Sequence, residues 1–594
     1  MTPNLRQDRD SGDSVESPEQ LRAHPSMTYG RMTPMAKPLS DTPSRADGTS
    51  KTVFDVLPAV LLSIFAALSW INRAPGMLTR QDDARYIVLG RALQTGSYRD
   101  VMWPGAPWHH MYPPGYPALL AFWMTIGGAR FDWLVVLQIA LSVGALMLMY
   151  GAARRALPRS VALGALAILA VSPWYIDWAG QVASEGALAA CFGLAIWGAT
   201  VLPRDGHQVA TVILAAALAP LMRAAGLALP AAVLALWISE RRFRDVALLL
   251  AVVLPIVIPL IAWTMMDPSH IPGNSYVGDI ALAGTPSVGS GHSAHTGGGH
   301  AGPVAGLVNR IATNARYYLT RALPVLLAAP TVEGTLVDNV VATALIAAGL
   351  VTGIVRAWRS FRLAVLLLLV SGGLLLLWPY NDARFVLPVM PALVAVLLYG
   401  IGQLGFLVNR RYATAATVAT TLVLAVSGLS TLGMAMAPAR ACARGLAIPP
   451  ANCVNPDQAS FFAATTFIRD SVPAGARVLS AKSEPLYIYS GHPTLPLAEW
   501  APVDSQAFWT GLRRLNTNYI LLGALHAAEK SVLAPRLRAH CESLYLVAAF
   551  PPHTYLFRVP SAGDTTGAGS GQAGRNRSVV CSRIDDYLRT APSP

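Results

Sequence analysis

The sequence predicts a polytopic α-helical membrane protein with a C-terminal α/β domain outside the membrane. Of its 594 residues, 53% are hydrophobic and only 13% are charged, whereas about a quarter of the residues of an ordinary soluble domain are charged. Apolar runs recur at the length that a helix needs to cross a bilayer, and the first extends from Val53 to Ile71. These runs stop after Met436. A soluble globular enzyme is therefore excluded.

The apolar runs set the expected membrane helices, about eleven in number. Two of them, around Val161 and Val209, are short, which leaves the count open by one or two. The expected spans begin at Val53, Phe131, Val161, Glu185, Val209, Ala224, Val246, Leu336, Leu363, Phe385 and Thr414.

Lys and Arg are concentrated in short loops between these runs. The net charge of +13 would suit nucleic acid, but short basic loops follow the positive-inside rule better, so we expect no nucleic-acid partner. Arginine clusters at 154–159, 241–244, 356–362 and 410–411 all lie on one side if the N-terminus is cytoplasmic. The odd span count then places the C-terminal domain on the periplasmic side of a bacterial inner membrane.

The chain divides into three expected parts. Residues 1–52 are polar and rich in Pro, Ser and Thr, which predicts a disordered cytoplasmic tail. Residues 53–435 form the transmembrane domain, whose first outer loop, 72–130, is long and polar. Residues 436–594 form the outer α/β domain, with strands expected at Arg477–Ser480, Tyr519–Leu522, Leu544–Phe550 and Thr554–Val559. Helices are expected at Ser460–Arg469 and His526–Arg538, and Ser561–Gly574 reads as a flexible insertion.

Four of the five cysteines fall in the outer domain, and Cys191 lies in an expected helix. The simplest disulfides are Cys442 with Cys453 and Cys541 with Cys581, although the sequence leaves the pairing open. The chain has no CxxC, HExxH or GxxxxGK[ST] pattern. An ATP-driven pump is therefore not indicated.

The first outer loop carries the acidic pair Asp82 and Asp83 in the run Thr79-Arg-Gln-Asp82-Asp83-Ala-Arg85-Tyr86. An amphipathic stretch follows and ends at Thr95-Gly96, which predicts a helix lying along the membrane surface. The ordinary explanation is a capping box between Thr79 and Asp82, with acids favoured at a helix start.

The run Met111-Tyr112-Pro113-Pro114-Gly115-Tyr116-Pro117 then returns the chain to the membrane, as an ordinary loop-to-helix junction also could. Asp-Asp-x-x-Tyr about thirty residues before Tyr-Pro-Pro-Gly-x-Pro resembles the C-type membrane glycosyltransferases. The likeness is to the branch of the protein O-mannosyltransferases and bacterial aminoarabinose transferases. Many members carry Asp-Glu where this chain has Asp82-Asp83, so which carboxylate reacts stays open.

Three later segments resemble the same family, so the resemblance covers roughly Val53 to Val559. Met222-Arg223-Ala-Ala-Gly226-Leu-Ala-Leu-Pro230 is similar to its Arg-x-x-Gly helix junction. Asn381-Asp-Ala-Arg384-Phe385-Val-Leu-Pro388 resembles its entry to a late helix, and Leu486-Tyr-Ile-Tyr-Ser-Gly, expected as a strand, resembles its outer tail.

The resemblance implies transfer of a sugar from a polyprenyl-phosphate-linked donor to an envelope acceptor, which is a lipid, glycan or protein, in contact with membrane lipids. Asp82 is the preferred general base, with Asp83 supporting it, and either acid would hold a divalent metal ion if one is used. Arg85, Arg223 and Arg384 would stabilise the donor phosphate, or else reach lipid headgroups. A single displacement would invert the anomeric carbon.

Further candidates have good ordinary explanations. Asp177 and Glu185 in the second outer loop are either site residues or interfacial and helix-start acids. The others are Tyr86, His109 and His110 of the first loop, and Lys482 and Glu484, which face the site or are solvated loop charges. The His-containing run Gly291–His300 is Gly-rich and is expected to be a linker rather than a metal site.

Two other classes of function compete with a transferase. A transporter or lipid flippase would show paired half-chain repeats, and the first-loop motif has no second copy in the C-terminal half. A catalytically silent partner subunit would keep the fold while its acids were dispensable.

Overall fold

The computed structural model describes residues 48–73, 82–266, 303–328, 336–378, 381–439, 454–497, 505–560 and 570–592. Four features considered above lie outside these residues: the N-terminal tail up to residue 47, Thr79, the Gly-rich His run, and the pair Cys442 and Cys453.

In the described residues, six helical stretches are long and apolar enough to cross a membrane, and a seventh is formed if a helix pair bent by 63° is one span. The six are Phe131–Ala156 (α4), Ser184–Val201 (α7), Phe243–Met265 (α10), Val340–Ala357 in α14 (Leu336–Ala357), Ala383–Val408 (η3, Ala383–Val389, with α16, Met390–Val408) and Tyr412–Gly433 in α17 (Tyr412–Ala439). The bent pair is α5 (Arg159–Ala170) with α6 (Pro173–Ala179).

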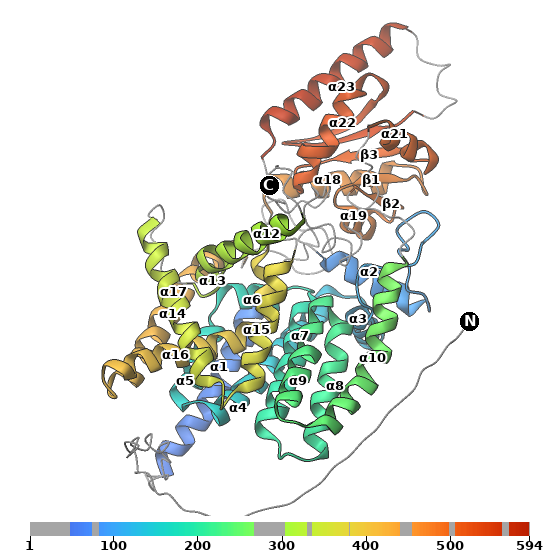
Figure 1. Ribbon diagram of the computed structural model, residues 1–594. Coiled ribbons are helices and arrows are strands. Elements are labelled where there is room, and N and C mark those ends of the chain that lie inside the picture. The colour runs from blue at the N-terminus through green and yellow to red at the C-terminus, as the bar shows by residue number, and fades with distance from the viewer. Residues whose placement is uncertain are drawn as a thin grey trace, which may run out of the picture. The chain divides into compact units, whose positions relative to one another are not determined.

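Shorter apolar helices accompany them: Val56–Ile71 in α1 (Gly48–Ile71), α8 (Gly206–Met222), Ala224–Ser239 (η1, Ala224–Leu227, with α9, Ala228–Ser239) and α15 (Arg362–Leu377). Every expected span start lies inside one of these helices (Figure 1). The chain is thus a multi-pass membrane protein, while the number of eleven spans stays a prediction.

The helices differ in what covers them. α16 is buried from Met390 to Leu398, so it forms the centre of the helical part. By contrast, α10 and α17 present large apolar side chains outward, with Ile258 59% and Val426 64% exposed. An apolar surface of this kind suits contact with lipid rather than water.

The first outer loop folds into two helices, α2 (Asp83–Gln94) and α3 (Gly115–Gly127). α2 ends as predicted, at Thr95 and a left-handed Gly96 with φ +79°. The prediction that this helix is amphipathic and lies along a surface is wrong, because nine of the twelve residues of α2 are buried. It packs against α3 and against α19 (Ser483–Ser490) of the C-terminal part, which cover the face expected to meet solvent.

The C-terminal residues form a five-stranded mixed sheet of order β2-β1-β3-β5-β4 (Figure 1). β1 (Val478–Ser480) is parallel to β2 (Thr494–Pro496) and β3 (Tyr519–Leu522), whereas β5 (Thr554–Arg558) is antiparallel to β3 and to β4 (Tyr545–Phe550). The parallel strands therefore end on one edge, next to Lys482 and α19.

Helices pack on both faces of this sheet. One face packs against α18 (Pro456–Ser471) and α19, and their apolar cluster continues into Ala84, Tyr86 and Ile87 of α2. The other face packs against α21 (Ser505–Arg514), α22 (Ala534–Ala539) and α23 (Ser570–Thr590). The apolar core thus runs without a break from the first loop into the sheet.

One expectation for this region is wrong and one is confirmed. Leu486–Ser490 was expected as a strand but belongs to α19, which ends at a left-handed Gly491 with φ 73°. Of the expected flexible insertion, residues 561–569 lie outside the described residues, and Ser570–Gly574 begins α23. Cys541 and Cys581 form the expected disulfide, which ties α23 to the turn before β4.

Candidate active site

The acidic pair stands at the N-terminus of α2, where Asp82 joins two distant parts of the chain. Its Oδ1 accepts a hydrogen bond from the Tyr112 hydroxyl at 2.7 Å, and its Oδ2 lies 3.1 Å from Nη1 of Arg384. Arg384 is 302 residues away in sequence. Three predicted motifs, the acidic pair, the Pro-Pro-Gly turn and the late helix entry, therefore meet at one carboxylate.

Asp83 has a different environment, although it is the next residue. Its Oδ1 accepts the Ala84 N–H at 2.8 Å, and burial raises its pKa to about 7 despite that bond and the nearby Lys482 ammonium. Burial alone would also raise the pKa of Asp82, but Arg384, Arg223 and the Tyr112 hydroxyl together lower it. The two neighbours thus differ in charge near neutral pH.

Arg223 and Arg384 stand together with three acids, which we call the arginine cluster. Nη1 of Arg223 donates to Glu185 Oε1 at 2.9 Å and to Ser184 Oγ at 3.0 Å. Nε of Arg384 lies 3.1 Å from Asp382 Oδ2. Both guanidiniums lie over the Phe385 ring, 5.5 and 5.2 Å from its centre. The cluster consists of Asp82, Glu185, Arg223, Asp382 and Arg384.

Two glycines of the predicted motifs allow this arrangement. A Cβ on Gly226 would lie 2.0 Å from the Ala219 carbonyl oxygen, and one on Gly115 would lie 2.7 Å from that of Leu221. Only glycine permits such close backbone approach. The helix therefore breaks after α8, where Arg223 is extended with φ −162° and directs its side chain to α7.

Arg85 lies between two other carboxylates. Its Nη2 is 2.7 Å from Glu484 Oε1 of α19 and its Nη1 is 3.1 Å from Asp100 Oδ1, with only 5% of the side chain exposed. These contacts connect the first loop with the C-terminal domain. The expected phosphate contact of Arg85 stays a prediction.

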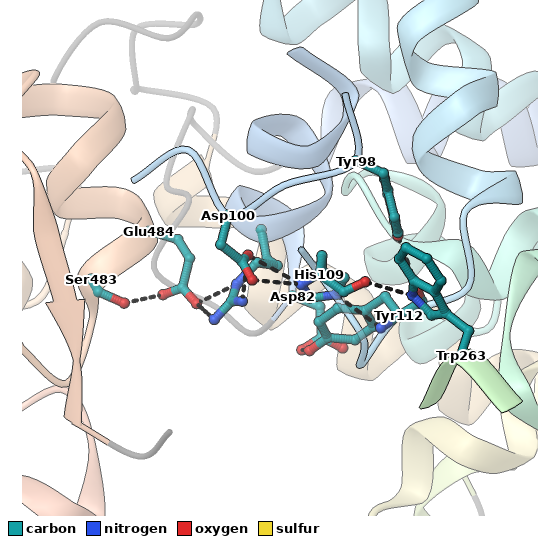
Figure 2. A network of polar contacts seen from close by, with 9 residues as sticks. Asp82, Tyr98, Asp100, His109, Tyr112, Trp263, Ser483 and Glu484 are labelled. Atoms are coloured by element: carbon teal, nitrogen blue, oxygen red, sulfur yellow. Dashed lines mark hydrogen bonds and ion pairs between the residues drawn. The ribbon is translucent and has the colours of Figure 1, made fainter. Parts of the chain in front are cut away.

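His109 extends this second group, the loop cluster of Arg85, Asp100, His109 and Glu484 (Figure 2). Nδ1 of His109 is 3.0 Å from Asp100 Oδ2, and its Nε2 accepts the Tyr112 N–H at 2.9 Å. Burial lowers the pKa of His109, and the Arg85 charge adds to this effect against the opposing Asp100. A neutral ring that accepts at Nε2 carries its proton on Nδ1 and donates it to Asp100.

The remaining predicted residues divide into those near the site and those with local partners. The Tyr86 hydroxyl is 2.9 Å from Ser184 Oγ, so it joins α2 to α7 beside Arg223. His110 Nδ1 contacts the Trp263 carbonyl oxygen at 2.8 Å. Asp177 accepts a hydrogen bond from Gln181, four residues on, at 2.8 Å. Lys482 lies close enough to Asp83 to lower its pKa.

Sequence reasoning missed Asp100, which belongs to no motif and to no periodic segment. It also gave no role to Ser184 or Asp382. Both lie beside motif residues in the sequence, which was the available signal. In the described part of the chain, no three His, Cys, Asp or Glu side chains converge as metal ligands, so the metal role of Asp82 or Asp83 stays a prediction.

Comparisons with known proteins bear on the fold. The model of the dolichyl-phosphate-mannose-protein mannosyltransferase family matches residues 111–263, from the Pro-Pro-Gly turn through α10. The structure of ArnT from Cupriavidus metallidurans bound to undecaprenyl phosphate is similar over 88% of this chain and 100% of its own, with 16% identity and a TM-score of 0.52. The chain has a C-type glycosyltransferase fold of the O-mannosyltransferase and ArnT type.

A second solved structure supports the same C-type fold. The oligosaccharyltransferase AglB from Archaeoglobus fulgidus, in complex with an inhibitory peptide and a dolichol-phosphate, matches 87% of this chain and 75% of its own, with 14% identity and a TM-score of 0.50. No curated protein sequence matches the chain. The predicted family resemblance is confirmed, and the family match includes Arg223 but neither acid of the pair.

Proposed function

We propose that this protein transfers a sugar from a polyprenyl-phosphate-linked donor to a hydroxyl of an envelope acceptor, which is a lipid, glycan or protein. The observation that carries the proposal is the ion pair between Asp82 and Arg384, in which Oδ2 and Nη1 lie 3.1 Å apart, beside Arg223. A base and two cations then stand together at breaks between apolar helices. Undecaprenyl phosphate in the ArnT structure and dolichol-phosphate in the AglB structure support this class of donor.

The chemistry needs few groups. The acceptor hydroxyl oxygen attacks the anomeric carbon while the bond from that carbon to the phosphate oxygen breaks, and the hydroxyl proton passes to a carboxylate. Polyprenyl phosphate leaves as an anion that Arg223 and Arg384 stabilise, because guanidinium groups form paired bonds to phosphate. One displacement from the opposite face inverts the anomeric carbon.

Asp82 remains the preferred base. Its side chain is 21% exposed and its lowered pKa keeps it ionised, so it can receive the acceptor proton directly. Asp83 is buried and bonded to its own helix turn. We assign Asp83 a supporting role next to the reacting acid.

The disulfide between Cys541 and Cys581 supports a periplasmic C-terminal domain, since disulfides form and persist in oxidising compartments. With the arginine-rich loops inside, the N-terminus is cytoplasmic and the acidic pair faces the periplasm. A scan of single cysteines with an impermeant thiol reagent tests this topology. Labelling of the 410–411 loop from outside would contradict it.

The deciding experiment is sugar transfer in membranes that contain the protein, with a panel of labelled polyprenyl-phosphate sugars. Asp82→Asn is expected to lower the rate by about 10²-fold or more, and Asp83→Asn by less. Asp585→Asn, an exposed acid of α23 paired with Arg538, is the matched control. Unchanged transfer in both acid variants would overturn the assignment, and no transfer from any donor would favour a transporter or a silent partner subunit.

A further inference from the structure

Polar links join the first outer loop to the C-terminal domain. One is the pair of Arg85 with Glu484 of α19. Another is a backbone hydrogen bond from the Thr494 N–H of β2 to the Met102 carbonyl oxygen, 3.0 Å long. The second link uses no side chain and therefore survives any substitution of Glu484.

Glu484 orients Arg85, which in turn orients Asp100. Glu484 Oε1 accepts a hydrogen bond from Nε of Arg85 at 2.8 Å and forms an ion pair with its Nη2 at 2.7 Å, while Oε2 accepts from the Ser483 hydroxyl at 2.9 Å. The guanidinium is planar, so two contacts on one edge fix the direction of Nη1, which donates to Asp100 at 3.1 Å.

Asp100 then fixes the orientation of His109 and, through it, Tyr112. The His109 ring is held at Nδ1 by Asp100 and accepts the Tyr112 N–H at Nε2. It also stacks on the Tyr112 ring, with ring centres 5.4 Å apart and planes 7° apart. Both the backbone and the ring of Tyr112 are therefore fixed, and its hydroxyl donates to Asp82 at 2.7 Å.

We propose that Glu484 of the C-terminal domain is a positioning residue for the Asp82 carboxylate and acts through this chain of contacts. The chain, which we call the positioning chain, runs through Glu484, Arg85, Asp100, His109, Tyr112 and Asp82 (Figure 2). The inference rests on the proposed function. The C-terminal domain then helps to hold the Asp82 carboxylate in position. This matters because a base that is misplaced by about 1 Å loses much of the rate.

Two measurements on the full-length protein test the chain. Glu484→Gln keeps the shape of the side chain but removes its charge, so hydrogen–deuterium exchange at the Tyr112 amide should rise about tenfold. In transfer assays the same variant should lose about tenfold in kcat or more, with the KM for the donor changed less than about twofold. Asp585→Asn, whose acid pairs with Arg538 on the far helices, should change neither quantity.

A double variant separates positioning from general damage. If the residues act as a unit, Glu484→Gln combined with Asp100→Asn lowers kcat no further than the more damaging single variant, whereas independent effects would multiply. Multiplying effects, unchanged exchange in Glu484→Gln, or faster exchange with unchanged kcat would each overturn the inference. Absence of transfer by the wild type would instead contradict the proposed function, and the exchange result would still decide whether Glu484 governs Tyr112.

Discussion

The arginine cluster and the loop cluster meet at the first turn of α2 and differ in how many arginines they bring together. In the arginine cluster, Arg384 contacts Asp82 directly and shares the Phe385 ring with Arg223, so two cations stand beside the candidate base. In the loop cluster a single arginine, Arg85, is enclosed by two carboxylates next to a neutral histidine. The arginine cluster thus brings two guanidiniums together, whereas the loop cluster has one.

The difference teaches that the most specific motif of the sequence does not mark the place where two arginines meet. Arg85 stands in the most specific motif of the sequence, but its donors point to Glu484 and Asp100. Arg223 and Arg384 stand in weaker motifs at breaks between apolar helices. A charge at such a break is costly, which makes both arginines candidates for recognition of a phosphate.

The largest expected effect comes from removing a cation of the arginine cluster. Arg384→Ala should lower transfer by about 10²- to 10³-fold, as for loss of one preorganised donor to a developing anion, and should destabilise the fold by roughly 3–5 kcal/mol because Asp82 and Asp382 lose their partner. Initial rates at saturating donor measure the loss of transfer, and thermal unfolding in detergent measures the loss of stability. The control is Arg411→Ala in an exposed loop, and transfer near the wild-type rate in Arg384→Ala would remove the distinction between the clusters.

A second effect separates the two acids by pH. The pKa of Asp83 is raised to about 7 from an ordinary 3.8, so its contribution to stability is full below about pH 4 and is lost as the pH rises through 7. Asp83→Asn should therefore stabilise the protein at pH 8, by up to roughly 4 kcal/mol, and change little at pH 4.

Asp82 should behave in the opposite direction. Its pKa is lowered in the fold, so its contribution is present above the unfolded pKa and is lost as the pH falls through the folded value. Unfolding in detergent at a series of pH values compares Asp82→Asn, Asp83→Asn and wild type. Parallel curves of unfolding free energy against pH for the two variants would contradict the opposite environments of Asp82 and Asp83.

A smaller effect tests the backbone that supports the arginine cluster. Gly226→Ala would place a Cβ 2.0 Å from the Ala219 carbonyl oxygen, and the resulting shift should cost about 1–3 kcal/mol of stability and weaken transfer through Arg223. Gly144→Ala in α4 is the control, because nothing lies within 4 Å of its added Cβ. Equal unfolding temperatures for both variants would show that the break does not need glycine.

The smallest effect concerns the loop cluster. Ser483→Ala removes the hydroxyl hydrogen bond to the Glu484 carboxylate and should cost about 1.5 kcal/mol of stability, with transfer within about twofold of wild type. The charged pair with Arg85 remains. A loss of transfer as large as that of Glu484→Gln would mean that the hydroxyl, and not the Arg85 pair, holds the carboxylate.

The sequence by itself determined the local structure. Each apolar run begins inside a helix, and β3 occupies Tyr519–Leu522 as predicted. These features depend on composition or on residues that are close together in the sequence, and both can be read from the sequence. The family resemblance placed Asp82 and Arg384 in one site, but it did not predict that the two side chains are in contact.

Tertiary structure alone decided which groups touch. Arg85 meets a residue 399 positions away, Asp100 enters the site from a loop without a motif, and Leu486–Ser490 is helical although its residues favour a strand. Such outcomes depend on how the first loop packs against the sheet. No local pattern contains that information, because the burial that makes each pairing necessary exists only once both surfaces are in contact.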